Sequence, residues 1–569
     1  MTQQHFAGLG VLAFATATAL SGVASAAPYY YAGYDATNSV PGTVDSPVTG
    51  AFSVAGQNTF YADAAGTVAY GPGVGVAASG ATEIYFGGTA TTAAYTASGG
   101  SGTSQNNIGT LVLNANNPGT NTFNTTYSAA GKGCYQFNTN TTGSGGGPGG
   151  AVLTPGIIQN GSANWTFGNS TNANAPLRLA STSAVIGGSG SGNITIPFNF
   201  AANGTGSLEV NLTGGASLIF ANGTTSPTIT NDFGGGNNTS TFTNFTLTAG
   251  TVDFQKNTRP FGSAKNQVRL NGGTLLSSTG TTVGEAYTGI GAVGGTAGIV
   301  IGGNVTVGGS LAWGLGPSNV TLTGNRTITS TNAAGVTVAG NVGESGGGYG
   351  LTLAGPGTLA LTGTVGYTGA TVVQSGKLVL APAAQTGTGG IDIRGGAAVL
   401  NYTGTSNIET IRGQLSTAFV AGSGVLTGGQ LRSSLATTKR GLGYSDDGVG
   451  ATTIKSTLFG DADLDGGVSI NDFNALAGNF GQSSGKHWTD GDFDYDGGVS
   501  INDFNLLAGS FGQTLPAGSD AWAGLLAFAA AQDDVAAFAA VTGVPEPTSV
   551  GIVAVGLTLG LRRRRRSVV

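Results

Sequence analysis

Two short runs of aspartate near the C-terminal end of this 569-residue chain have the spacing of metal ligands. Asp461, Asp463 and Asp465 stand at alternate positions, and Asp492, Asp494 and Asp496 repeat that spacing. Carboxylates at positions 1, 3 and 5 of a tight loop supply the oxygen ligands that a hard cation such as Ca²⁺ prefers. The pattern therefore predicts two Ca²⁺ ions as the cofactors of this chain.

Each run opens a calcium loop, 461–472 or 492–503, with a glycine at position 6 that permits a sharp turn. Position 7 would offer a backbone carbonyl, position 9 a serine that binds through water, and position 12 a carboxylate from the first helical turn. Val468 and Val499, at position 8, are expected to pair in a small core. The predicted ligands are Asp461, Asp463, Asp465, Gly467 and Asp472 in the first loop, and Asp492, Asp494, Asp496, Gly498 and Asp503 in the second.

One short helix is expected after each loop, because apolar residues recur there at helical spacing. Gly481 and Gly512 are expected to end these helices. His487 and Trp488 lie in the connector between the two units and are expected to serve in packing rather than as ligands. An Ala-rich helical spacer is expected over residues 516–543. The apolar stripe consists of Ile470, Phe473, Leu476, Phe480, Ile501, Phe504, Leu507 and Phe511.

The duplicated loop and helix, with Asp at position 12 and no entering helix, resembles the type I dockerin module across residues 458–515. The resemblance implies a fold built around two Ca²⁺ ions and docking on a cohesin-like or other surface protein, often in the assembly of glycan-degrading enzymes. Carried over by position, the docking residues are Ile470 and Asn471 in the first copy and Ile501 and Asn502 in the second. The basic and hydroxyl residues common on the docking face of the family are missing here.

Most of the chain before these loops repeats a phrase in which glycine is followed by Thr, Ser or Lys and then by alternating apolar residues. Period-two alternation after a glycine predicts short β-strands. A repeat of about 20 residues predicts a mainly β fold, a parallel β-helix or solenoid of about 13 rungs and about 60 Å. A small α module and a C-terminal hydrophobic helix follow it. The phrase occurs at 109–113, 206–210, 250–254, 273–276, 357–361 and 376–380.

The solenoid is assigned to residues 161–455, and the Gly-rich residues 27–160 before it are interpreted as either a capping β-domain or degenerate rungs. Residues 350–380 resemble the autotransporter-associated β-strand repeat. That resemblance implies a passenger-like parallel β-helix on a bacterial surface and names no ligand. Acidic side chains in the rod are interpreted as solvated surface charges, namely Glu83, Glu209, Asp253, Glu285 and Glu344.

Both ends of the chain have features of sorting signals. An apolar segment followed by Ala24, Ser25 and Ala26 fits a signal peptide over residues 1–26. Residues 544–569 resemble the PEP-CTERM sorting signal, in which Pro545, Glu546 and Pro547 precede an apolar segment and five arginines. The resemblance implies processing by an exosortase-type enzyme at this tripeptide and a location in the bacterial envelope, at the outer surface or outside the cell. Residues 549–561 would contact the inner membrane transiently, because they are too few for a permanent span.

The composition excludes several classes of function. Only 8% of the residues are charged, and 105 are glycine. The chain before its tail lacks the clustered Lys and Arg that bind phosphates, so no nucleic acid is expected as a partner. Two histidines are too few for a multi-His zinc site and make a catalytic triad hard to build. Cys134 is the only cysteine, so no intrachain disulfide can form.

These features predict a non-enzymatic exported protein, in which a solenoid rod for display or adhesion carries a calcium-dependent docking module. No catalytic residue is assigned, and a polysaccharide is left open as a further partner. The alternative is a polysaccharide-degrading enzyme or its accessory, tethered through residues 458–515, since such enzymes also use β-helices and paired carboxylates. A third hypothesis is a calcium-dependent module that joins surface-layer subunits.

Overall fold

A computed structural model describes residues 334–421 and 423–515 without a break, and a series of strands with some of their turns between residues 29 and 332. The predicted signal peptide, the Ala-rich spacer, the sorting signal with its segment 549–561, Glu285 and Cys134 lie outside the described residues. In the part of the chain that is described, no helix is long and apolar enough to cross a membrane.

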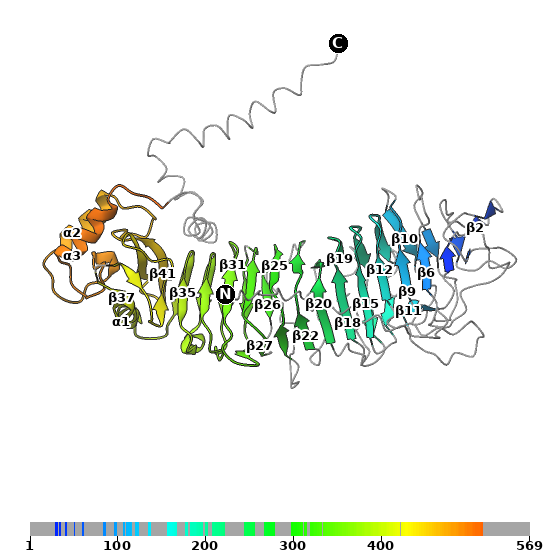
Figure 1. Cartoon of the computed structure of the whole chain (residues 1–569), viewed down its shortest axis with the longest axis horizontal. Coiled ribbons are helices and arrows are strands. Elements are labelled where there is room, and N and C mark those ends of the chain that lie inside the picture. The colour runs from blue at the N-terminus through cyan, green and yellow to red at the C-terminus, as the bar shows by residue number, and fades with distance from the viewer. Residues whose placement is uncertain are drawn as a thin grey trace, which may run out of the picture.

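The described residues confirm a mainly β fold whose long sheets are consistent with a β-solenoid (Figure 1). The strands stack side by side along an elongated body, from the strands around β6 near one end to those around β35 near the other; we call this stack the rod. Two sheets extend along most of it. In spatial order, the 14-stranded parallel sheet contains β4 (Gly50–Ala51), β7 (Thr96–Ser98), β10 (Thr120–Asn124), β13 (Asn164–Phe167), β16 (Ile194–Ile196), β19 (Ser217–Phe220), β21 (Thr251–Phe254), β23 (Thr274–Ser277), β25 (Val305–Gly309), β28 (Arg326–Ser330), β31 (Leu351–Ala354), β33 (Thr371–Val373), β35 (Ile391–Ile393) and β39 (Leu431–Arg432).

The second long sheet is parallel except at β5, which pairs antiparallel with β1. Strands between residues 29 and 113 join it directly, so the Gly-rich region shares a sheet with the rod. In spatial order, its 12 described strands are β5 (Phe60–Tyr61), β1 (Tyr29–Tyr31), β6 (Glu83–Phe86), β9 (Thr110–Leu113), β12 (Gly156–Gln159), β15 (Ser183–Gly188), β18 (Ser207–Leu212), β20 (Asn244–Ala249), β22 (Gln267–Leu270), β24 (Ile299–Ile301), β27 (Val320–Leu322) and β30 (Val342–Glu344).

Smaller sheets complete the β structure of the described residues. One short parallel sheet contains β8 (Asn106–Ile108), β11 (Tyr135–Phe137), β14 (Leu177–Leu179) and β17 (Phe200–Ala202). A seven-stranded sheet contains β26 (Trp313–Leu315), β29 (Val336–Val338), β32 (Thr358–Leu361), β34 (Lys377–Leu380), β36 (Ala397–Asn401), β41 (Ala451–Leu458) and β40 (Arg440–Asp446). Two hairpins are formed by β2 (Tyr34–Asp35) with β3 (Val40–Pro41), and by β37 (Phe419–Val420) with β38 (Val425–Leu426).

The repeated phrase is the local cause of these strands. Each of its six copies begins a strand directly after the glycine, at β9, β18, β21, β23, β32 and β34. In β32 and β34 the second and fourth residues are buried, and their partners pair in register, Leu359 with Leu378 and Leu361 with Leu380. Each rung therefore covers the apolar side chains of the previous one, which no rung could bury alone.

Asparagine and glycine fix the corners of the rod. The Asn164 side-chain oxygen accepts from the Asn193 backbone N–H at 2.8 Å, and the Asn193 oxygen accepts from Ser217 at 2.9 Å. Gly376 has a φ of +77°, and a Cβ there would lie 2.5 Å from the Gly357 carbonyl oxygen. A side chain at this corner would therefore both strain the backbone and separate two rungs.

Two acidic residues of the rod, Asp253 and Glu344, make hydrogen bonds within the rod that the sequence did not indicate. Asp253 is 6% exposed and accepts hydrogen bonds from the backbone N–H and the hydroxyl of Ser278. The interpretation of Asp253 as a solvated charge is therefore wrong. Glu344 binds the Tyr349 N–H at 2.6 Å and the Thr368 hydroxyl at 2.7 Å, and these bonds hold its pKa below the ordinary value.

At its C-terminal end the rod changes from parallel to antiparallel pairing. β36 pairs antiparallel with β41, which pairs antiparallel with β40. Helix α1 (Ile408–Ala418) packs on β38, β39 and β40 and buries Ile411, Leu415 and Ala418. These elements cover the last rungs, and the two helices of the calcium loops lie beyond them (Figure 1). The described helices are completed by α2 (Ile470–Asn479), α3 (Ile501–Ser510) and the 3₁₀ turns η1 (Pro382–Thr386) and η2 (Trp488–Asp490).

Candidate metal centre

Both predicted calcium loops end in a capped helix. The Ser469 hydroxyl accepts from the Asn471 N–H at 3.1 Å, and the Asp472 carboxylate accepts from the Ser469 N–H at 2.7 Å. Ser500, Asn502 and Asp503 repeat these contacts at the start of α3, at 3.1 and 2.8 Å. Reciprocal capping satisfies N–H groups that an α-helix leaves free in its first turn. The two loops therefore enter their helices in the same way.

The structure brings the carboxylates at positions 1, 3 and 5 of each loop together. One oxygen from each of Asp461, Asp463 and Asp465 lies within 4.8 Å of the other two, and Asp492, Asp494 and Asp496 form a second such triad. The acid at position 1 also holds the turn, because its Oδ2 accepts from the glycine N–H at position 6, at 3.0 Å in both loops. Each triad could hold a metal ion.

The backbone of each loop is bent in a way that ordinary residues rarely adopt. Leu464 and Tyr495, at position 4, have φ values of +62° and +63°, and they alone among the described non-glycine residues have positive φ. Such a conformation costs of order 1 to 3 kcal/mol and persists only where the surroundings enforce it. Both side chains are buried, which supplies that enforcement.

The second loop buries carboxylates that the protein itself does not fully satisfy. Asp492 is fully buried, and its Oδ1 has no hydrogen-bond partner. Burial raises the pKa of Asp492 to about 8, with the neighbouring Asp503 carboxylate as the next cause. Burial likewise raises the pKa of Asp494 to about 6. A buried carboxylate with one oxygen unsatisfied is costly unless a cation neutralises it, so these residues fit an oxygen-preferring ion such as Ca²⁺.

The first loop also has carboxylates with raised pKa values, but both oxygens of its position-1 acid, Asp461, have hydrogen-bond partners. The Asp461 Oδ1 accepts from the Asp465 N–H at 3.1 Å, and the Thr457 hydroxyl donates to Oδ2. Burial, followed by contributions from neighbouring carboxylates, raises the pKa of Asp461 well above its ordinary value and also raises those of Asp463 and Asp465. Lys455 lies close by, with its ammonium group donating to the Leu464 carbonyl at 3.1 Å. This loop therefore has a resident positive charge at its edge.

The remaining predicted ligands surround the triads without joining them. Asp472 and Asp503 are buried, and their Oδ1 atoms accept from the backbone at position 2, Ala462 at 2.8 Å and Phe493 at 2.7 Å. A carboxylate has about four acceptor positions, so these bonds leave capacity for an ion. Gly467 and Gly498 donate their N–H groups to the carboxylates at position 5, at 2.8 and 2.7 Å.

The two loops and their helices, residues 458–515, are called the module below. Its two halves, each a loop with its helix, are joined by reciprocal hydrogen bonds. Val468 exchanges backbone hydrogen bonds with the segment after α3, to Gln513 and from Gly512, at 2.9 and 2.8 Å. Val499 exchanges them with the segment after α2, to Gln482 and from Gly481, both at 2.8 Å. Both valines are buried, as expected, and each loop holds the end of the other loop's helix. An ion bound in one loop would therefore support both halves.

The module is attached to the rod by buried aromatic residues. The Tyr495 hydroxyl both donates to the Leu442 carbonyl and receives the Leu442 N–H, each at 3.1 Å. The Tyr495 ring contacts Phe419, Tyr444 and Trp488, with ring centroids 5.4, 6.4 and 5.6 Å apart. Since Tyr495 is a loop residue and Leu442 lies in β40, the second calcium loop is part of the packing at the rod end. No local pattern in the sequence predicted this long-range contact.

The connector residues contribute to the same junction. Trp488 is fully buried, and its indole N–H donates to the Asp461 carbonyl at 2.5 Å, which confirms its expected role in packing. His487 lies 2.9 Å from the Glu409 carboxylate on α1, and Arg412 of α1 donates to the Tyr495 carbonyl at 3.3 Å. These contacts tie both loops to α1 and β40.

Helices α2 and α3 and their C-terminal ends expose several large apolar side chains, alongside exposed asparagines. Ile470 and Ile501, the first residues of α2 and α3, are 59% and 58% exposed, and Phe480 and Phe511 are 53% and 49% exposed. A shallow groove between the helices is lined by Phe473, Leu476, Ala477, Phe480, Ile501 and Phe504. Of the predicted stripe, only Leu476 and Leu507 belong to the buried core. Helical spacing had revealed the stripe but not that most of it faces outward.

Comparisons with protein-family models, curated proteins and solved structures found no match for this chain. Its function must therefore be inferred from the geometry of the loops and helices.

Proposed function

We propose that this chain is an exported, non-enzymatic protein of a bacterial surface or extracellular matrix, with a solenoid rod for display or adhesion and a calcium-dependent docking module. The observation that carries the proposal is the pair of carboxylate triads in the loops that lead into two capped helices, which expose large apolar side chains. Calcium would neutralise the triads and fix the helix starts, and α2 and α3 would present the docking face. The resemblance to dockerins supports a cohesin-like domain or another surface protein as the partner.

The rod would act as a passive support in this arrangement. Its outward positions are largely neutral, and its apolar positions are used in rung stacking. Large exposed apolar side chains instead gather on the module, which contributes Ile470, Phe480, Ile501, Phe504 and Phe511. Clusters of exposed apolar residues are more typical of interaction surfaces than of the rest of a protein surface. Export and sorting follow from the signals proposed at residues 1–26 and 544–569, with exosortase-type processing at Pro545, Glu546 and Pro547.

Docking can be tested with immobilised type I cohesin domains as the probe. The full chain should be captured in 1 mM Ca²⁺ and released by excess EDTA. Because the docking face is pseudo-symmetric, Ile470→Ser or Ile501→Ser alone should weaken capture only slightly, whereas the double variant should weaken it at least tenfold. Val449→Ser is the matched control, since Val449 is 88% exposed and lies outside the module. Capture that ignores EDTA, or survives the double variant unchanged, would contradict the docking proposal.

A further inference from the structure

The sheets of the rod do not all end at the same rung. The 12-stranded sheet stops at β30, followed only by an isolated bridge between Val342 and Val365. The 14-stranded sheet continues through β33, β35 and β39. Across the continuously described residues 345–421, no later strand extends the shorter sheet. Apolar side chains that the next rung would have covered are left facing a gap on that side.

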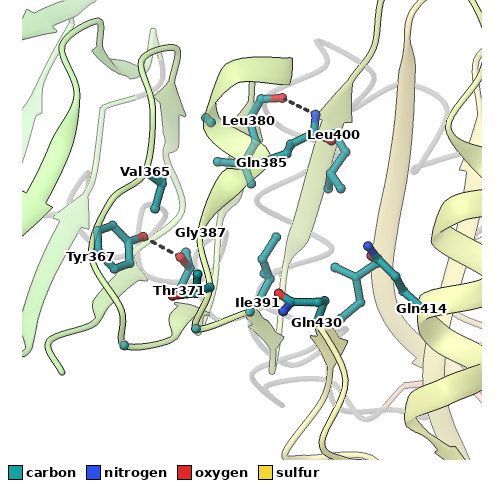
Figure 2. Close-up of a pocket in the computed structure, with 16 residues that line it drawn as sticks. Val365, Tyr367, Thr371, Leu380, Gln385, Gly387, Ile391, Leu400, Gln414 and Gln430 are labelled. Atoms are coloured by element: carbon teal, nitrogen blue, oxygen red, sulfur yellow. Dashed lines mark hydrogen bonds between the residues drawn. The ribbon is translucent and has the colours of Figure 1, made fainter.

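A recess of about 300 Å³ occupies this gap between the last rungs and α1 (Figure 2). Its lining includes the aliphatic side chains of Val365, Leu380, Leu400 and Leu431. The 3₁₀ turn η1 stands at one side of the recess, where Gln385 is held by a 2.6 Å hydrogen bond from its amide to the Asn401 carbonyl. The recess therefore has a preformed wall on the rod side.

The chemistry of the lining is neutral and hydrogen-bonding. None of the 16 residues that line the recess carries a charge. Tyr367 and Thr371 bond to each other through their hydroxyls, and burial raises the pKa of Tyr367 to about 12, so this phenol stays protonated. Arg432 lies next to this lining, but its guanidinium donates to the Gly389 and Gly429 carbonyls at 2.9 and 3.1 Å. An ion buried in the recess would therefore have no charged partner within the lining. The lining therefore favours an uncharged ligand.

Two amide side chains are free to recognise that ligand. Gln414 projects from α1 and Gln430 from the segment before β39, and Figure 2 shows both at the α1 side of the recess. Neither side chain makes a hydrogen bond to another described residue, whereas Gln385 is already engaged. Each primary amide offers an acceptor and two donors. A ligand with several hydroxyl groups can use both kinds at once.

We propose that this recess is a binding site for a single neutral sugar ring. The apolar C–H groups of a pyranose would contact the aliphatic side chains of the lining, and its hydroxyls would bond to Gln414 and Gln430. The volume is at the lower end of the range for ligand pockets, about 300 to 1,000 Å³, which suits one ring rather than a longer chain. This site is separate from the calcium loops, so it stands independently of the docking proposal.

The test is saturation-transfer NMR on the calcium-loaded full chain with the methyl glycosides of glucose, galactose and mannose, each at 10 mM. At least one should receive saturation, and glucuronate should bind at least tenfold more weakly because it carries a charge. Gln414→Leu and Gln430→Leu should each weaken the productive glycoside about tenfold. Both side chains are at least partly exposed and lack partners, so these variants should fold normally. Gln374→Leu is the matched control, because Gln374 is exposed and does not line the recess.

Three results would overturn the proposal. Absence of transfer to all three glycosides would mean that the recess holds only water. Equal transfer in the wild type and in the Gln414→Leu, Gln430→Leu double variant would place sugar binding elsewhere. Binding of glucuronate as tight as that of the neutral glycosides would contradict the argument from the uncharged lining.

Discussion

The rod and the calcium module bury opposite kinds of side chain. In the rod, each rung buries neutral apolar side chains against identical positions of its neighbours, as Leu359 and Leu378 do. In the module, carboxylates are buried close together, and Asp492 lacks a partner for one oxygen. The region from 458 to 544 contains 12 acidic residues and a single basic residue, Lys486. The difference teaches that the rod contains its own stabilising partners, whereas the buried carboxylates of the module are groups that a bound cation would stabilise.

The largest expected effect comes from calcium withdrawal, which should separate the two regions. With EDTA, amide protection in α2, α3 and both loops should fall at least a hundredfold, because each ion bound at 100 times its dissociation constant contributes about 2.7 kcal/mol. Amides of β31 to β34 should change little. Hydrogen–deuterium exchange of the full chain measures both at once. Equal loss of protection in rod and module would show that the rod also depends on calcium.

The converse prediction concerns a residue of the rod core. Leu378 is fully buried in β34, so Leu378→Ala should lower the free energy of unfolding by about 2 to 5 kcal/mol. The next residue, Val379, points to the other side and is half-buried, so Val379→Ala should cost less than about 1 kcal/mol. Denaturant unfolding should give the same difference with and without calcium. Equal effects at the two positions would contradict the alternating burial of the strand.

Removing the Tyr495 hydroxyl should weaken the junction between the rod and the module. Tyr495→Phe removes both hydrogen bonds to the Leu442 backbone and leaves those buried groups unsatisfied, which costs about 1 to 3 kcal/mol. We expect the module to melt at a lower temperature than the rod in this variant, in calorimetric scans with saturating calcium. Tyr402→Phe is the control, because its hydroxyl binds Asp446 away from the module. A single unchanged transition would mean that the hydroxyl does not couple the two regions.

The last expected effect is a graded pH dependence confined to the module. The pKa values of Asp492 and Asp494 are raised to about 8 and about 6, so the ion-free folded loops bind more protons than the unfolded chain. Their stability without calcium should therefore fall as pH rises from about 4 to 8. Calcium must displace these protons, so its affinity should rise at least tenfold over pH 6 to 8. Titrations in buffers of different ionisation enthalpy should show proton release; affinity independent of pH would contradict the raised pKa values.

Local patterns were sufficient to predict the strands and the acidic triads. Gly376 and the alternation after it determine β34 within a few residues, and Asp461, Asp463 and Asp465 converge because the turn at position 6 is equally local. The roles assigned to the sorting segments stay predictions, because those segments lie outside the described residues.

Contacts between distant parts of the chain were not predictable. Tyr495 meets Leu442 across 53 positions, and no periodicity indicates that a calcium loop will pack on the rod end. Asp253 was misread because its partner, Ser278, lies one rung away. Ile470 and Ile501 were read as part of an apolar stripe, while their exposure depends on how the two helices pack. Burial of this kind is a property of the assembled fold rather than of the segment.

The most direct test of the central claim is a calorimetric titration of Ca²⁺ into the full chain. We predict two bound ions for the wild type, one each for Asp461→Ala and Asp492→Ala, and none for the double variant. Glu209→Gln, which changes a carboxylate in β18 of the rod, should still bind two. No binding to the wild type, or two ions retained by the double variant, would contradict the account.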